Sequence, residues 1–247
     1  MAQIVVHETD IELDRPTLIE GLPGVGLVGK IATDHVVDSL EMTHYASVQC
    51  EGLPQLAVYH EGDSGVRAPV RVYADEDRDL LALQSEVPVS PRGATEFAEC
   101  VTGWLADNEV TPIFLSGRPS EDRVDVPELF GIATGDGARL LSEAEIEDPT
   151  ETGAVSGPTG ALLAKAAEID LSGVGLVVES DPQFPDPAAA RVLIDRGIEP
   201  IAGVEVDTDA LVDRAEEIRE QRERLAQRMQ EVGDDQSTQA QPLRMYQ

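Results

Sequence analysis

Apolar residues along this chain alternate between short continuous runs and longer segments in which they recur every three or four positions. Short runs are typical of buried strands, and the longer spacing is typical of helices that pack by one face. Glycine, proline and acidic residues separate these segments. The pattern predicts helices over residues 27–40, 95–107, 161–169 and 187–196, and extended segments over residues 5–6, 17–20, 45–50, 55–59, 70–74, 80–84, 112–116, 129–133, 139–141 and 174–179.

The alternation of apolar strands with helices predicts an α/β fold, in which helices cover both faces of one sheet in a three-layer α/β/α sandwich. The length of 247 residues suits one large domain with appendages. We assign residues 1–206 to the α/β domain, residues 207–232 to a long C-terminal amphipathic helix, and residues 233–247 to a flexible tail.

The C-terminal helix has apolar residues at alternating spacings of four and three, which is a heptad pattern over about three repeats. Arg222 occupies the one polar position in this row. Two interpretations fit the pattern: the helix lies on its own domain, or it joins copies of the chain into a homo-oligomer. In the second interpretation the contact is formed by Leu211, Ala215, Ile218, Leu225, Met229 and Val232.

The tail is polar at first and apolar at its end. Residues 234–241 are acidic, amide-bearing or small, a composition that cannot bury a core and that predicts a flexible tether. The sequence then closes with Pro242-Leu243-Arg244-Met245-Tyr246-Gln247. Such an ending presents an apolar side chain, an aromatic ring with a hydroxyl, and a carboxylate, which together suit a pocket with an apolar wall and a lysine.

The charge of the chain excludes several classes of partner. Its 18 basic and 48 acidic residues give a formal net charge of −30, and only Lys30 and Lys165 are lysines. Such a charge repels nucleic acids and anionic lipids, so we expect neither as a partner. Because molar salt shortens the Debye length to about 3 Å, we interpret this composition as that of a protein from a salt-rich cytoplasm.

Cysteine content and hydropathy exclude further classes of protein. Cys50 and Cys100 are the only cysteines, too few for a disulfide framework, a zinc ribbon or a three-cysteine iron–sulfur site. No apolar run reaches the roughly 18 residues of a membrane span, and the first eight residues lack the features of a signal peptide. We therefore expect a cytoplasmic protein with no membrane partner.

The segment Gly24-Val25-Gly26-Leu27-Val28-Gly29 matches the dinucleotide-binding pattern G-x-G-x-x-G, between a predicted strand and a predicted helix. It also approaches a P-loop, but Ile31 stands where a serine or threonine must hold magnesium. The acidic residue expected about 20 positions later is misplaced, since Glu41 comes too early and Glu51 too late. Three interpretations stay open: a turn that needs glycine for packing, a nicotinamide or flavin site, or a site for an anion or other small ligand formed by Gly24, Gly26, Gly29 and Lys30.

The remaining polar residues give no recognisable catalytic or metal site. The four histidines have no metal-ligand spacing, and Ser116 is not in a G-x-S-x-G motif. Glu179, Asp181 and Asp186 follow a predicted strand, where α/β proteins bind ligands, but a proline-fixed loop that caps the next helix explains them more simply. We expect no metal, no cofactor and no catalytic residue.

A series of short glycine- and proline-containing motifs runs along the chain in a fixed order: Gly21-Leu22-Pro23-Gly24-Val25-Gly26-Leu27-Val28-Gly29, Gly52-Leu53-Pro54, Ser85-Glu86-Val87-Pro88, Gly157-Pro158-Thr159-Gly160 with Leu162-Leu163, and Pro185-Asp186-Pro187-Ala188-Ala189-Ala190. By their order and spacing, the chain from about residue 5 to the end of the last helix resembles the proteasome assembly chaperone 2 family.

This resemblance implies a three-layer fold similar to that of nucleoside phosphorylases, without catalytic residues. It implies an archaeal protein, haloarchaeal by its charge, that binds the α-subunits of the proteasome core particle. Met245-Tyr246-Gln247 fits the hydrophobic–tyrosine–any motif with which proteasome activators dock between α-subunits. We expect a homo-oligomeric assembly chaperone or activator-like protein that presents C-terminal tails. The alternative is an enzyme of nucleoside-phosphorylase-like fold that binds a small anionic ligand at the glycine-rich turn.

Overall fold

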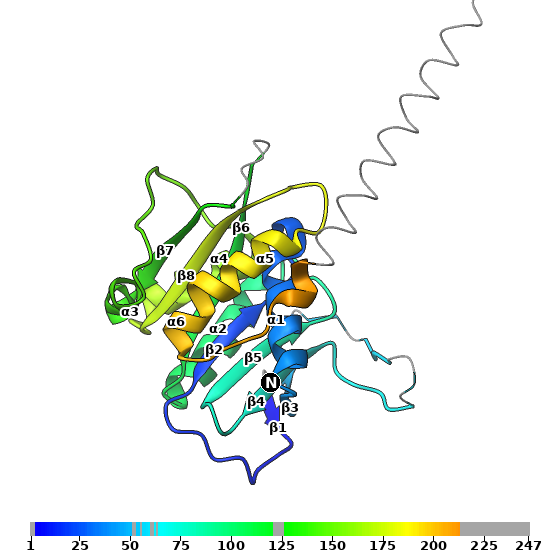
Figure 1. The fold of residues 1–247 in the computed structure, drawn as a ribbon. Coiled ribbons are helices and arrows are strands. Elements are labelled where there is room, and N and C mark those ends of the chain that lie inside the picture. Colours follow the sequence, from blue (N-terminus) through cyan, green and yellow to red (C-terminus); the bar gives the residue numbers. More distant parts are fainter. Residues whose placement is uncertain are drawn as a thin grey trace, which may run out of the picture.

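A computed structural model describes residues 3–50, 53–54, 56–59, 62, 64–120 and 126–212. These residues form one eight-stranded sheet with helices on both faces (Figure 1). The strand order is β1-β3-β4-β5-β2-β6-β8-β7. The bounds are β1 Gln3–Val6, β2 Thr17–Gly21, β3 Thr43–Gln49, β4 Val70–Asp75, β5 Leu80–Ser85, β6 Thr111–Pro119, β7 Leu129–Thr134 and β8 Gly173–Ser180.

The centre of the sheet is parallel and its edges are antiparallel. Strands β5, β2, β6 and β8 run in the same direction, whereas β4, β3 and β1 on one side and β7 on the other are joined by antiparallel pairing. Parallel strands covered on both faces read as continuous apolar runs. In β2, for example, Leu18 and Ile19 are both buried, each in the core on a different face of the sheet.

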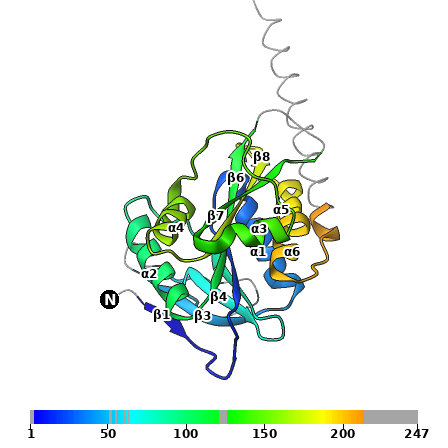
Figure 2. The same cartoon turned by 90° about the vertical axis from the view of Figure 1, so that its left-hand side faces the viewer.

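Figure 2 views the sheet between its two helical layers. One layer contains α2 (Ala94–Asp107) and α4 (Gly157–Glu168), which pack against each other. The other contains α1, α3, α5 and α6. Their bounds are α1 Val28–Ser39, α3 Ala138–Glu143, α5 Pro187–Leu193 and α6 Glu199–Ala202, with a π-helical segment Ile194–Ile198 between the last two. The three-layer arrangement predicted from the sequence is confirmed.

Two local predictions differ from the structure. Residues 139–141, predicted as extended, lie in helix α3. Of the predicted strand 55–59, the described residues show one isolated bridge, between Val58 and Arg67. Short segments carry too few residues for periodicity to separate strand from helix.

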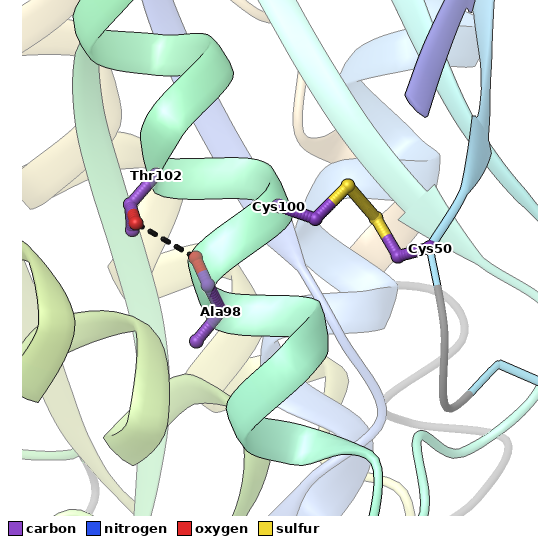
Figure 3. Close-up of a disulfide and its surroundings, with 4 residues drawn as sticks. All are labelled: Cys50, Ala98, Cys100 and Thr102. Carbon is purple, nitrogen blue, oxygen red and sulfur yellow. Dashed lines mark hydrogen bonds between the residues drawn. A yellow bond between two sulfur atoms is a disulfide. The ribbon is translucent and has the colours of Figure 1, made fainter. Parts of the chain in front are cut away.

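The two cysteines are joined by a disulfide, which the sequence analysis did not anticipate. Cys50 follows β3 and Cys100 lies in α2, with their Cα atoms 6.1 Å apart (Figure 3). In the same helix, the Thr102 hydroxyl donates to the Ala98 carbonyl over 2.7 Å, on either side of Cys100 in the sequence. The bridge therefore fastens the end of an antiparallel strand to the helical layer that covers it.

The segment that follows α6 is held against the domain up to Leu211. The His35 imidazole of α1 donates to the Asp207 carbonyl over 2.6 Å, and the Thr208 hydroxyl donates to Asp195 over 3.0 Å. Leu211 is fully buried in the core of the α1 face. Leu211 thus packs within its own domain and is not available for a contact between copies of the chain. The other five predicted contact residues lie outside the described residues.

The ends of the predicted domain organisation also lie outside the described residues. This applies to most of the helix 207–232, to the tail 233–247 and to the docking residues Met245, Tyr246 and Gln247. Within the described ranges, no helix is both long enough and apolar enough to cross a membrane.

Candidate functional site

The glycine-rich turn connects the carboxyl end of β2 to the start of α1, as the sequence predicted. Gly24 precedes a 3-10 turn, Val25–Leu27, and α1 begins at Val28. Gly26 has a φ of 59°, a left-handed conformation that favours glycine because it has no Cβ. The turn packs onto the segment after β8, where the Asp186 N–H donates to the Gly26 carbonyl over 2.9 Å.

Packing explains two of the three motif glycines. A Cβ at Gly26 would overlap the Ser180 side chain, and one at Gly29 would lie 3.2 Å from the Leu115 Cβ. Gly24 is different, since a Cβ there would meet nothing within 4 Å and its backbone is extended, with φ −143°. The interpretation as a turn that needs glycine for packing therefore fits Gly26 and Gly29 but leaves Gly24 unexplained.

A cavity of about 800 Å³ lies beside this turn, at the carboxyl ends of β2 and β6. One wall is formed by residues 22–25, 28 and 29 of the glycine-rich turn and the start of α1, and another is the end of β6 from Leu115 to Pro119. The rest of the lining is Phe130 and Ile132 of β7, Val177 of β8 and most of residues 149–159. Ligand sites of α/β proteins lie at this edge of a parallel sheet, and the volume is within the range of small-molecule sites.

Glu20, the last but one residue of β2, is fully buried beneath the cavity. Its Oε1 accepts from the Thr159 hydroxyl over 3.0 Å and from the Leu22 N–H over 3.2 Å, and its Oε2 accepts from the Leu115 N–H over 3.2 Å. Burial raises the pKa of Glu20 from 4.5 to about 8, although these three hydrogen bonds act to lower it. At neutral pH the carboxyl is therefore mostly protonated.

The rim of the cavity is acidic. Arg118 donates to Glu179 over 2.7 Å and to Glu151, and it lies 3.8 Å from Glu128. Its guanidinium also lies over the Phe130 ring, 5.6 Å from the centroid. Glu151 belongs to the connection between α3 and α4, so this ion pair ties the connection to the end of β6. Three carboxylates surround one cation at this rim.

Lys30 lies away from the cavity. Its ammonium is 2.8 Å from Asp34 and 3.8 Å from Glu86, and Asp34 in turn accepts from the Gln84 amide over 2.8 Å. Burial raises the pKa of Asp34, and Lys30 acts to lower it. Of the four residues predicted as a ligand site, the structure thus brings Gly24 and Gly29 to the cavity, places Gly26 behind it and directs Lys30 into a separate polar network.

The carboxylates after β8 have structural roles. Asp186 caps α5 by accepting from the Ala189 N–H over 3.0 Å and also accepts from the Ser180 hydroxyl over 3.3 Å. This confirms the interpretation of the segment as a loop that caps the next helix. Among the described residues, no three histidine, cysteine or acidic side chains are grouped so as to hold a metal ion.

The sequence analysis missed the residues that give the cavity its chemistry. Glu20 and Thr159 are 139 residues apart in the sequence, and only the fold joins them. A signal for Glu20 was present, because a carboxyl at the end of the apolar run Thr17-Leu18-Ile19-Glu20 is exceptional in a buried strand. Arg118 had no such signal.

Comparison with known proteins places this geometry in a family. The model of the PAC2 family matches residues 18–226. PbaA of Pyrococcus furiosus, described as an archaeal homolog of proteasome-assembly chaperone, is 26% identical, with 94% of this chain and 99% of that chain covered and a TM-score of 0.77. PbaB of the same organism, described as an archaeal proteasome activator, is 25% identical over 91% of this chain and 98% of that chain, with a TM-score of 0.78. An uncharacterised protein of Methanocaldococcus jannaschii is 26% identical over 232 residues, or 90% of each chain.

Proposed function

The chain belongs to the PAC2 family, and from this premise we propose that it is a proteasome-associated assembly chaperone or activator-like protein. It binds α-subunits of the core particle through its C-terminal tails. The observation that carries this proposal is the likeness, over nine-tenths or more of the chain, to both PbaA and PbaB of Pyrococcus furiosus. One of these is a homolog of an assembly chaperone and the other an activator, so a proteasome-related role is common to both.

The tail supplies the contact. Met245 offers an apolar side chain and Tyr246 a ring with a hydroxyl, and we propose that Gln247 contributes a carboxylate. A short peptide of this kind is recognised by an apolar pocket with a cation for the carboxylate. The 12 residues 233–244 span at most about 40 Å, which lets several tails of one assembly reach several pockets of one ring.

The active form is a homo-oligomer. A single tail binds weakly, because ordering a peptide opposes association, and linked tails gain affinity from their high effective concentration. Five residues of the heptad row form the contact between copies: Ala215, Ile218, Leu225, Met229 and Val232. Leu211 is excluded from this contact because it is buried in its own domain.

The net charge of −30 is consistent with a protein of the salt-rich cytoplasm of a haloarchaeon. The same charge opposes binding to nucleic acids. We do not propose the alternative of an enzyme that binds an anion at the glycine-rich turn. Lys30 and Arg118 are the cations of the described residues that could bind an anion near this turn. Lys30 is already paired with Asp34, and Arg118 with Glu179 and Glu151. The likeness to nucleoside phosphorylases stays a prediction.

Surface plasmon resonance on immobilised α-subunit rings tests this function. Deletion of residues 245–247, Tyr246→Ala, and addition of one residue after Gln247 should each greatly weaken binding, because each removes the ring or displaces the carboxylate. Tyr59→Ala is the matched control, since Tyr59 is 80% exposed on the globular domain and lies outside the tail. It should bind like the wild type.

A double variant separates docking from avidity. Leu225→Glu combined with Met229→Glu places charge in the heptad contact and should dissociate the oligomer, as measured by light scattering, because an unpaired buried charge is strongly destabilising. Its affinity for the ring should then fall to that of a single tail. Retention of wild-type affinity by all three tail variants would place the contact on the globular domain and refute the role of the tail.

A further inference from the structure

The cavity beside the glycine-rich turn has the position, the size and the lining of a small-molecule site, which docking by C-terminal tails does not use. It lies at the carboxyl ends of β2 and β6 and has a volume of about 800 Å³. Apolar side chains such as Val25, Phe130 and Val155 line most of it, with a few polar groups between them. Small-molecule sites combine an apolar wall and a few polar groups in this way.

Gly24 supports this assignment independently of the cavity volume. Its extended backbone is open to any residue, and a Cβ there would meet nothing within 4 Å. Neither backbone conformation nor packing inside the protein therefore requires glycine at this position. Its place on the cavity wall offers a different explanation for glycine at this position, because a missing side chain lets the backbone approach a bound molecule closely.

The polar group at the floor is the Thr159 hydroxyl, which lines the cavity and is bonded to Glu20 over 3.0 Å. A hydroxyl has one proton to donate and two lone pairs that accept. The Thr159 hydroxyl donates this proton to the Glu20 carboxyl, and because burial raises the pKa of Glu20 to about 8, that carboxyl is mostly neutral at pH 7. The floor of the cavity is therefore polar but presents no charge to a ligand.

The charge at the rim disfavours an anion. Arg118 is the cation on the described lining, and it is surrounded by Glu179, Glu151 and Glu128. A phosphate or carboxylate would have to displace one of these partners and would face the others. An uncharged molecule meets no such repulsion. The connection that carries Glu151 covers the cavity and is tied down by this same ion pair.

We propose that this cavity binds an uncharged small molecule with an apolar body, which packs against the backbone of Gly24 and lies over the Thr159 hydroxyl. The site is separate from the C-terminal tail, so it and the proteasome-related function can fail independently.

Fluorescence titration with two naphthalene dyes tests the proposal. Prodan is uncharged and carries a ketone, whereas anilinonaphthalene sulfonate is an anion of similar size. In molar potassium chloride, which screens the net charge of the protein, the wild type should bind prodan with one dye per chain and a blue-shifted emission. The sulfonate should bind at least about tenfold more weakly, because the acidic rim disfavours anions.

Gly24→Phe fills the cavity from its wall and should weaken prodan binding at least about tenfold. Gly103→Phe is the matched control, because a Cβ at Gly103 also meets nothing within 4 Å, but this residue lies in α2 and outside the lining. It should bind prodan like the wild type. Circular dichroism establishes that each variant is folded.

Gly153→Phe fills the cavity from the connection between α3 and α4, and a Cβ at Gly153 also meets nothing within 4 Å, so this variant decides the question if Gly24→Phe does not fold. It should weaken prodan binding at least about tenfold, and binding equal to that of the wild type would overturn the proposal. The proposal is overturned if the wild type does not bind prodan, if Gly24→Phe binds it as tightly as Gly103→Phe, or if the sulfonate binds as tightly as prodan.

Discussion

Glu20→Gln is expected to destabilise the protein in mild acid and to stabilise it in mild alkali. The reason is the proton that the buried carboxyl retains. In the folded state the pKa of Glu20 is raised from 4.5 to about 8 by burial, with three accepted hydrogen bonds opposing the rise. In the unfolded chain the carboxyl is in water and loses its proton near its ordinary pKa.

The sign depends on which state binds the proton more tightly. Between pH 4.5 and about 8 the folded state keeps the proton while the unfolded state has released it, so the free energy of unfolding falls as pH rises through this window. At about 1.36 kcal/mol per pH unit, the loss is about 3 kcal/mol at pH 7 and approaches 5 kcal/mol above about pH 9. Below 4.5 both states are protonated and the effect vanishes.

Glutamine removes this pH dependence but loses one hydrogen bond. Glu20 accepts from the N–H groups of Leu22 and Leu115, one on each oxygen. An amide nitrogen cannot accept, so one of these buried N–H groups is left unpaired in the variant. That loss destabilises the fold by roughly 1–3 kcal/mol. Glutamate is therefore the more stable residue below about pH 6, and glutamine is the more stable above it, by about 2–4 kcal/mol in alkali.

Urea unfolding in molar potassium chloride, followed by the fluorescence of Trp104, measures this difference between about pH 5 and pH 9. The difference between wild type and variant cancels the other acidic groups, which both proteins share. Glu99→Gln is the matched control, because it makes the same carboxyl-to-amide change at an exposed position of α2, outside the core. A wild-type–variant difference that stays constant across this range would refute the assignment of Glu20 as a buried neutral acid.

Two further predictions concern the disulfide and the charge. Cys50→Ser combined with Cys100→Ser should lower the free energy of unfolding by about 4 kcal/mol, since the bridge closes a loop with a sequence separation of 50; a reductant should shift the melting temperature of the wild type and leave that of the variant unchanged, and an insensitive wild type would show that the bond does not form in solution. The melting temperature of the wild type should rise steeply between low and molar potassium chloride, because salt screens the self-repulsion of a net charge of −30. A midpoint that does not depend on salt contradicts the interpretation of the composition as salt adaptation.

Local pattern predicted most of the elements of this fold, because buried strands and one-faced helices record their environment in consecutive residues. Helix α1 and strand β8 are examples, both predicted within a few residues. The order of the strands was not predicted. In the structure β1 pairs with β3, and β2 pairs with β5 and β6. Pairing across the chain depends on which faces fit together, and periodicity within a segment does not contain that information.

The candidate site shows the same division. The position of the glycine-rich turn was predicted because its strand, turn and helix are contiguous. The pairs Glu20–Thr159, Arg118–Glu179 and Cys50–Cys100 join residues that are 139, 61 and 50 positions apart. Each becomes visible only when the sheet and its two helical layers are assembled. The pair Lys30–Asp34 is different, because its residues are four positions apart in α1 and the helix pattern alone allows this contact.

Burial of Leu211 fixes the chain to the globular domain at this residue, so the residues that follow Leu211 start from a defined position. The Asp207 carbonyl is held by His35 and the Thr208 hydroxyl by Asp195, so this point is rigidly mounted on α1 and on the helical segment after α5. In an assembly of identical copies, symmetry repeats the mount along with the domain. The distance between the Leu211 residues of neighbouring copies is then set by how the domains are arranged. The distance that each chain can extend from its domain is set by the residues after Leu211. Spacing and reach can therefore change independently, the first by substitutions on the domain surface and the second by insertions or deletions after the mount.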